Sequence, residues 1–247
     1  MAIVDGNGGG VVGALEGRTA LVAGGTGRVG GGIAGALLAE GARVVVPGRD
    51  AGRLAALRDR AGDDAGRLVT IEGDIADPDD AGRVRDLAGP LDAVAVAVGG
   101  WWSGPPLWEV DPGDWDAVLA RNTRSHFVIA RALMPGLVDR PGASWTAISG
   151  TAAEEPAAGS SLASVSSAAT LMLTRNLAAE ARQARVRVNA LVLSAVRGDQ
   201  GGNPEQLTAP EVGRVVAWLA SDAASMVDGS VIRLPGRPDP GASPGSG

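Results

Sequence analysis

The sequence predicts an α/β fold in which a doubly wound parallel sheet of about seven strands carries helices on both faces. The main observation is that short β-branched runs alternate with longer Ala-, Leu- and Arg-containing segments of helical period. A second is that no linker interrupts this alternation. A third is size, because 247 residues with 45% hydrophobic composition supply material for a large core.

The predicted strands are short apolar runs bounded by turn residues. Their β-branched composition suits a sheet that is covered on both faces. In chain order we expect them at Thr19–Ala23, Arg43–Val46, Arg67–Glu72, Ala93–Val98, Ser144–Ser149, Arg187–Leu193 and Val231–Leu234.

The predicted helices fill the gaps between these strands, as repeated strand–helix–strand units require. We expect them at Val29–Glu40, Ala51–Ala61, Asp79–Leu87, Asp114–Leu137, Ser160–Arg182 and Ala209–Ser221.

The domain organisation follows from composition. Residues 15–236 are predicted to form a single domain. Residues 1–14 form a Gly-rich N-terminus, and residues 237–247 form a Pro/Gly/Ser tail. Both ends carry too little apolar surface to offset the entropy of ordering, so we expect the first to be flexible and the second to be disordered.

Composition also limits the chemistry. All 22 basic residues are Arg, and the chain has no Tyr, no Cys and one His. A Lys Schiff base, a Cys nucleophile, a phosphate-binding Lys and a Tyr/Lys proton-donor pair are therefore excluded, as is a thiolate or poly-His zinc site. We expect no metal.

Charge and hydropathy bear on partners and location. The net charge of −6 argues against nucleic acid or an anionic membrane as the main partner. No apolar run approaches membrane-spanning length, and no basic residue precedes Arg18 to begin a signal peptide. We expect a cytoplasmic protein.

A glycine-rich turn follows the first predicted strand and opens the first helix. Gly24, Gly27 and Gly30 have the spacing G-x-x-G-x-x-G. Glycines at such a junction let backbone N–H groups approach a pyrophosphate at the helix N-terminus, as in Rossmann-type folds. The alternative is a tight turn without a ligand. The candidate cofactor residues of the turn are Gly24, Thr26, Gly27, Arg28, Val29 and Gly30.

Several segments resemble the short-chain dehydrogenase/reductase family over about residues 15–236. They match in order and spacing, which is why we identify the chain as a divergent member. The matching segments are Leu15–Val22, Asp74-Ile75, Asp114-Trp115 with Asn122, Leu173–Glu180, Val186–Ala190 and Leu219–Asp222.

The resemblance implies a dinucleotide cofactor. Asp74 and Ile75 match the family's adenine contact. Gly99 is the last residue of Val96–Gly99, the segment at the position of the family's Asn-Asn-Ala-Gly motif. Where an NAD-preferring member usually has an acid, this chain has Arg49, which fits a 2′-phosphate, and Arg28 can join it. NADP(H) is therefore favoured over NAD(H), the alternative being that both are ordinary surface arginines.

The resemblance also locates the catalytic positions. The family transfers hydride between nicotinamide and a carbonyl or alcohol, using Tyr, Lys, Ser and Asn. The Tyr position falls on Ala163, the Lys position on Ser167 and the Ser position on Gly150, so only Asn122 is retained. Asn122 is a candidate catalytic residue, and its alternative role is to hold a helix kink or a water.

Other side chains are candidates for acid–base chemistry or substrate binding. Glu154 and Glu155 follow the altered Ser position, and His126 shares a helix face with Asn122. The alternatives are a solvated acidic loop for the glutamates and a packing or interface role for His126. The candidate pocket residues are Trp101, Trp102, Ser149, Gly150, Thr151, Ala163 and Ser194.

Trp101 and Trp102 suggest a flat aromatic ligand, because indoles stack on such molecules, although they equally suit a subunit contact. Three functions remain open. The first is an NADP(H)-binding oxidoreductase relative with a degenerate active site. The second is a non-catalytic subunit or cofactor sensor of an active paralogue, and the third is an isomerase, dehydratase or cyclase. We expect a homo-oligomer, or a hetero-oligomer with a paralogue, through the long helices after Asp114 and Ser160.

Overall fold

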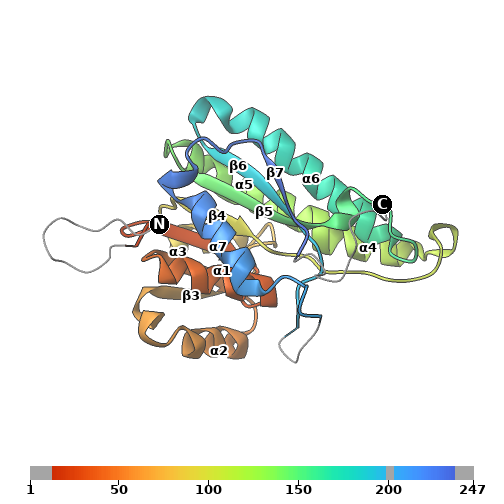
Figure 1. Cartoon of the computed structure of the whole chain (residues 1–247), viewed down its shortest axis with the longest axis horizontal. Helices are drawn as coiled ribbons and strands as arrows, with labels where there is room; N and C mark the ends of the chain where they lie inside the picture. Colours follow the sequence, from red (N-terminus) through yellow and green to blue (C-terminus); the bar gives the residue numbers. More distant parts are fainter. Residues whose placement is uncertain (1–12, 199–202, 237–247) are drawn as a thin grey trace, which may run out of the picture.

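The fold is a single parallel sheet of seven strands, as predicted (Figure 1). The strands lie in the order β3-β2-β1-β4-β5-β6-β7. A computed structural model describes residues 13–198 and 203–236. The order reverses beside β1, since the chain builds outward to β3 and then returns to place β4 on the other side. The strands are β1 Thr19–Ala23, β2 Arg43–Gly48, β3 Leu68–Glu72, β4 Ala93–Val96, β5 Ser144–Gly150, β6 Arg187–Leu193 and β7 Val231–Leu234.

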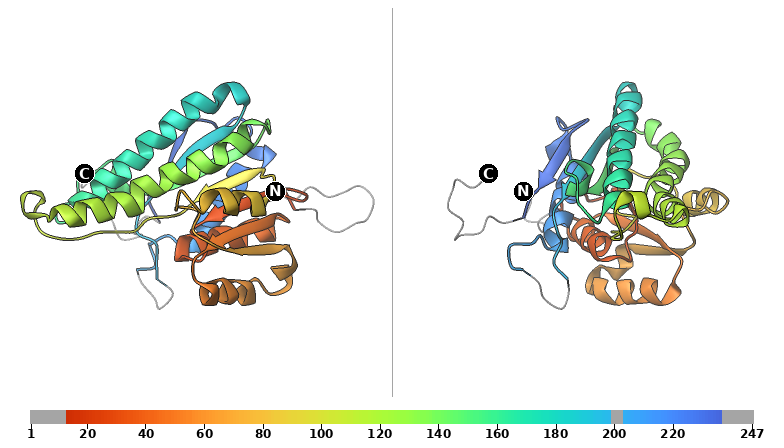
Figure 2. Two further views of the ribbon diagram at one scale, coloured as in Figure 1. Left: turned by 180° about the vertical axis from the view of Figure 1, so that it is seen from behind. Right: turned by 90° about the vertical axis from the view of Figure 1, so that its right-hand side faces the viewer.

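Helices cover both faces of the sheet (Figure 2). Buried side chains of α1, α2 and α7 form one core, and those of α3, α5 and α6 form the other. The helices are α1 Arg28–Ala39, α2 Ala51–Ala61, α3 Ala81–Ala88, α4 Pro112–Leu119, α5 Ser125–Val138, α6 Ser161–Ala181 and α7 Ala209–Ala220.

The two cores share the central strands. In β1, Leu21 faces the core of α3, α5 and α6, whereas Val22 faces the core of α1, α2 and α7. Val94 and Ala95 of β4 divide in the same way. Successive side chains of a strand point to opposite faces, so a strand covered on both sides is apolar throughout.

The contact between α1 and α7 is close enough to exclude side chains at its centre. A Cβ built on Gly32 would collide with the Ala209 backbone, and a Cβ on Gly213 would collide with the Gly32 carbonyl oxygen. Glycine at both positions therefore sets the spacing of these two helices.

The predicted helix over Asp114–Leu137 is not continuous. It starts earlier, at Pro112, where the Asp111 carboxylate accepts a hydrogen bond of 2.7 Å from the Gly113 amide. A π-helical turn at Ala120–Arg124 then separates α4 from α5. Such turns insert one extra residue and re-aim the side chains around them, a geometry that the period of the apolar residues does not reveal.

Other boundaries differ slightly. Residues 62–67 form a 3₁₀ turn, so β3 starts at Leu68 rather than at Arg67. The Arg67 guanidinium bonds to the Leu38 carbonyl at 2.8 Å and to Asp64 at 2.6 Å. The predictions for the N-terminal segment up to residue 12 and for residues 237–247 lie outside the described residues.

Candidate functional site

The carboxyl ends of β1 and β4 meet where the strand order reverses, the usual place for a ligand in an open α/β sheet. Gly24 follows β1 and has a φ of +82°. A Cβ at Gly24 would collide with the Ala97 carbonyl oxygen, just after β4. The turn therefore requires glycine to bring the two strand ends together.

The first turn of α1 presents backbone donors at this edge. Gly27 is the N-cap residue, with no side-chain cap, and its own amide bonds to the Gly24 carbonyl at 2.9 Å. The Gly31 amide bonds back to Gly27 at 2.8 Å, so the amides of Arg28, Val29 and Gly30 precede the first intrahelical hydrogen bond. Free amides and a positive helix end fit a pyrophosphate.

Arg49 and Asp74 lie together at the carboxyl ends of β2 and β3. The Arg49 Nη1 is 3.5 Å from the Asp74 Oδ2, and the Arg49 side chain is 80% exposed. An exposed pair of this length contributes little to stability, so the guanidinium is available to an anion. Ile75 is buried in the core instead, and only its backbone can face a ligand.

Arg28 lines a groove to which Arg49 does not contribute. A groove of about 560 Å³ between α1 and α2 is lined by Arg28, Arg53 and Arg60, among others, but not by Arg49. The Arg53 Nη2 donates to the Thr26 carbonyl at 3.0 Å, which ties α2 to the glycine turn. The structure thus places Arg28 and not Arg49 with the other arginines of this groove.

A cavity of about 170 Å³ lies between the ends of β4 and β5 and the helices α5 and α6. It brings together Ala163, Ser167 and Gly150, the three positions at which the resemblance implies Tyr, Lys and Ser. Its lining residues are Val98, Gly99, Gly100, Trp101, Asn122, His126, Ile148, Ser149, Gly150, Ala163, Ser166, Ser167 and Thr170.

Asn122 connects the π-helical turn to both neighbouring segments. Its Oδ1 accepts from the Gly100 amide at 3.0 Å, and its Nδ2 donates to the Gly100 carbonyl at 3.1 Å. Nδ2 also donates to the Ser166 Oγ of α6 at 2.9 Å. The buried amide therefore fixes the loop after β4 against α6.

His126 lies one turn further along, on α5, and is almost completely buried. Its Nε2 is 3.4 Å from the Val98 carbonyl oxygen, which favours the tautomer with the proton on Nε2. Nδ1 has no hydrogen-bond partner among the described residues. Burial lowers the pKa of His126 to about 4, so the ring is neutral at neutral pH.

No lining residue of the cavity carries a charge at neutral pH. The set contains no Asp, Glu or Arg, and its histidine is neutral. Its polar groups are hydroxyls, an amide and an imidazole. The arrangement can form hydrogen bonds, but it has no ionised acid or base of ordinary strength.

The two tryptophans after β4 have different positions. Trp101 lines the cavity and is 62% exposed, with its Nε1 donating to the Ser103 Oγ at 2.8 Å. The Trp102 ring packs against Gly104 and does not line the cavity. Only Trp101 is therefore placed to meet a ligand there.

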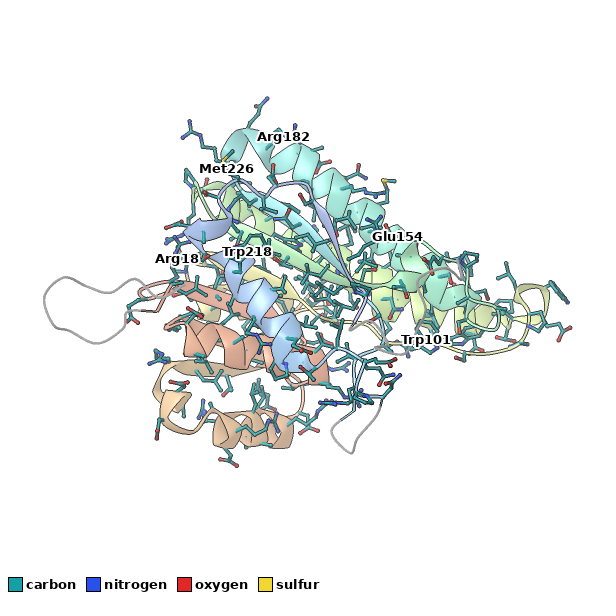
Figure 3. All side chains as sticks on the ribbon, in the orientation of Figure 1. Arg18, Trp101, Glu154, Arg182, Trp218 and Met226 are labelled. Carbon is teal, nitrogen blue, oxygen red and sulfur yellow. The ribbon has the colours of Figure 1, made fainter. Side chains whose placement is uncertain are left out.

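Neither Glu154, which is labelled in Figure 3, nor Glu155 lines the cavity. Both oxygens of Glu154 pair with Arg233 of β7, at 2.7 Å from Nε and 2.6 Å from Nη2. Glu155 is exposed. Thr151 and Ser194 also lie outside the lining.

Sequence reasoning missed several hydroxyl positions. Ser166 and Thr170 line the cavity and were not among the candidates, and Ser167 was identified only as a lost Lys position. With Ala163 they follow the spacing of one helix face. That period was visible in the sequence, but a run of small residues gave no reason to select it.

An apolar face lies on the outside of α5 and α6, which run side by side (Figure 2). Phe127 is 54% exposed and Met172 is 53% exposed. With Met134, Val138 and Leu173 they surround a groove of about 960 Å³. Contiguous exposed apolar surface of this kind commonly marks an interaction site.

Within residues 13–198 and 203–236, no helix is long and apolar enough to cross a membrane. The same residues contain no cluster of three or more potential metal-binding His, Cys, Asp or Glu side chains.

Comparison with known proteins gives consistent matches. The family described as short chain dehydrogenase matches residues 18–205. Versicolorin reductase stcU of Emericella nidulans is 29% identical, with 90% of this chain and 96% of that protein covered. Hydroxynaphthalene reductase-like protein Arp2 of Metarhizium acridum is 30% identical, with 90% and 95% covered.

A solved short-chain dehydrogenase/reductase from Mycobacterium ulcerans superimposes with a TM-score of 0.84 at 27% identity, and 90% of each chain is covered. The sheet order and the match over most of the chain agree. The chain belongs to the short-chain dehydrogenase/reductase family.

Proposed function

We propose that this chain binds NADP(H) and that its active site is degenerate, so that ordinary carbonyl reduction is not supported. The observation that carries the proposal is the cavity in which Ala163, Ser167 and Gly150 meet beside Asn122. These are the positions implied for the family's catalytic side chains, and the chain contains no Tyr or Lys to replace them from elsewhere.

The remaining residues support binding more than chemistry. A bound nicotinamide cofactor supplies a hydride. The amides at the start of α1 suit the cofactor's pyrophosphate, and Gly24 has no side chain to obstruct it. Hydride delivery to a carbonyl also needs a proton, and a positioned acid typically contributes roughly 10² to 10⁴ in rate. Asn122 cannot supply that proton, because an amide does not ionise at neutral pH.

The preference for NADP(H) rests on Arg49. Its exposed guanidinium stands where the cofactor ribose is expected, beside the Asp74 carboxylate. Arg49→Ala is expected to weaken NADPH binding by about tenfold or more, because hydrogen bonds to charged groups are strong. NADH binding should change little. Arg175→Ala is the matched control, because Arg175 is an exposed arginine of α6 that lines neither the groove nor the cavity. Fluorescence titration of both cofactors measures the effect, and an equal loss for NADH would contradict the assignment.

The proposed degeneracy is tested by restoring the family's residues. Gly150→Ser, Ala163→Tyr and Ser167→Lys together are expected to raise kcat/KM for a simple ketone by about a hundredfold or more over wild type. The control is Ala163→Phe with the other two changes, which fills similar volume without a hydroxyl. Efficient ketone reduction by the wild-type chain, or absence of saturable NADPH binding, would overturn the proposal.

The second candidate function is that of a non-catalytic subunit. It is favoured by the apolar face of α5 and α6, around Phe127 and Met172. A second copy or an active paralogue would cover this face. The acid–base alternative has less support, because Glu154 is paired with Arg233 and Glu155 is exposed.

We also propose an aromatic small-molecule ligand. Trp101 presents an exposed indole at the cavity. Two relatives are named for ring compounds, a hydroxynaphthalene reductase-like protein and a cis-toluene dihydrodiol dehydrogenase.

A further inference from the structure

We propose that the cavity at Ala163 and Ser167 is itself a binding subsite for a neutral, single-ring molecule that bears a hydroxyl group, the chemistry of a phenol. The inference deepens the proposed function, on which it rests, because it assigns a ligand to the volume in which the family's Tyr and Lys side chains are implied. It concerns binding only and invokes no reaction.

The size of the cavity indicates one ring. Its volume is about 170 Å³. An engineered apolar cavity of about 150 Å³ in another protein binds benzene, so a space of this size holds a six-membered ring and little more. A two-ring system would have to extend past Trp101 into solvent.

The absence of charge in the lining selects a neutral ligand. None of the lining residues is ionised at neutral pH, since the only titratable member is the neutral His126. Transferring a carboxylate or ammonium group into such a space is costly. The Arg121 guanidinium donates at 3.4 Å to the Asn122 Oδ1 and to the Trp101 carbonyl, but Arg121 does not itself line the cavity. A cation at the Ser167 position would have reversed this preference.

The hydroxyl groups of the cavity select a ligand that can both donate and accept. The Ser149 Oγ donates to the Ser167 carbonyl at 3.4 Å, and its oxygen lone pairs are available to accept from a ligand. The Ser167 hydroxyl has no partner among the described residues and can donate. Ser149 and Ser167 both line the cavity. A ligand hydroxyl would therefore donate to Ser149 and accept from Ser167.

Neighbouring polar groups do not compete for this role. The Ser166 Oγ accepts from Asn122 at 2.9 Å and lies 3.2 Å from the Ala163 carbonyl, to which it donates. The Thr170 Oγ1 donates to the Ser166 carbonyl at 2.9 Å. The internal bonds of α6 thus already use these two hydroxyl protons. Ser167 remains the free donor of this helix face.

The experiment titrates three matched probes into the full-length protein by calorimetry: phenol, toluene and benzoate. Phenol is expected to bind saturably at one site per chain. Toluene lacks the hydroxyl and therefore both of its hydrogen bonds, to Ser149 and to Ser167. It should bind more weakly than phenol by more than about fivefold, which is the effect of a single hydrogen bond. Benzoate should show no saturable binding over the same range.

Variants locate the subsite. Ser167→Ala should weaken phenol binding about fivefold, because the hydrogen bond donated by Ser167 is lost while the one to Ser149 remains, and should leave toluene binding unchanged. Ala163→Phe fills the volume and should abolish binding of both. Ser164→Ala is the control, because Ser164 lies on α6 outside the cavity and its hydroxyl bonds to the Ser160 carbonyl. Circular dichroism of each variant verifies folding.

Three results would overturn the inference: no saturable phenol binding, benzoate binding as tight as phenol binding, or unchanged phenol affinity in both the Ser167→Ala and the Ala163→Phe variant. NADPH is titrated into the same samples. If the wild-type protein binds phenol but shows no saturable NADPH binding, the result counts against the proposed function alone. If the wild-type protein binds NADPH but shows no saturable phenol binding, the result counts against the phenol subsite alone.

Discussion

At the scale of single residues, Gly24 shows how strongly one position can constrain the site. Its φ of +82° and its contact with Ala97 both exclude a side chain. We expect Gly24→Ala to lower the free energy of unfolding by about 2 kcal/mol and to weaken NADPH binding, since a non-glycine residue is strained in this conformation. Urea unfolding and fluorescence titration measure the two effects.

Gly35 is the matched control for that variant. It lies within α1, it is exposed, and a Cβ there meets no atom within 4 Å. Gly35→Ala should raise the free energy of unfolding by about 0.5–1 kcal/mol, because alanine is the better helix former. Equal destabilisation by Gly24→Ala and Gly35→Ala would show that the turn does not require glycine at position 24.

His126 predicts a dependence of stability on pH. Its pKa falls from 6.5 in the unfolded chain to about 4 in the folded chain because of burial. Between these values unfolding takes up a proton, so acid favours the unfolded state. The contribution of neutral His126 to the free energy of unfolding is fully present above about pH 6.5. It is lost as the pH falls toward 4, and the total loss is about 3 kcal/mol.

The measurement compares wild type with His126→Phe in urea unfolding across that range. Carboxylates titrate in both proteins, so the difference between the two pH profiles isolates His126. We expect wild type to lose about 3 kcal/mol more than the variant on acidification. Parallel profiles would mean that folding does not lower the pKa of His126.

At the scale of secondary-structure elements, the apolar face of α5 and α6 predicts association. Met172→Glu places a charge among exposed apolar side chains and should shift an oligomer toward monomer, as judged by light scattering after size exclusion. Leu87→Glu on α3 is the control, because Leu87 is 56% exposed and lies outside this face. A wild-type protein that is already monomeric would contradict the prediction.

The elements themselves were largely predictable. Strand runs such as Thr19–Ala23 and Arg187–Leu193 have the predicted bounds, because their apolar residues and turn neighbours define them locally. The π-helical turn at Ala120–Arg124 was not predictable, since it depends on the tertiary hydrogen bonds of Asn122 to Gly100 and Ser166.

The candidate site was predictable in its backbone and less so in its side chains. The glycine turn has a local signature, and Gly24 occupies the expected junction. The grouping of Arg28 with Arg53 and Arg60 and the pairing of Glu154 with Arg233 depend on residues distant in sequence. Long, flexible charged side chains find such partners only in the folded chain.

At the scale of the whole molecule, a dinucleotide bound across the edge of the sheet would couple the two cores. We expect NADPH at about a hundred times its Kd to stabilise the protein by about 2.7 kcal/mol, seen as a rise in Tm. NADH at the same concentration should give a smaller rise. Equal shifts for the two cofactors would remove the support for a 2′-phosphate site at Arg49.

The close packing of α1 against α7 makes the position of α1 depend on α7. About one turn of helix separates Arg28, the first residue of α1, from Gly32, which packs against Ala209 and Gly213. A methyl group added at Gly213 would collide with Gly32, displace α1 and shift the glycine turn at its start. A substitution in α7 would thus alter ligand binding at the glycine turn through the packing of α7 against α1.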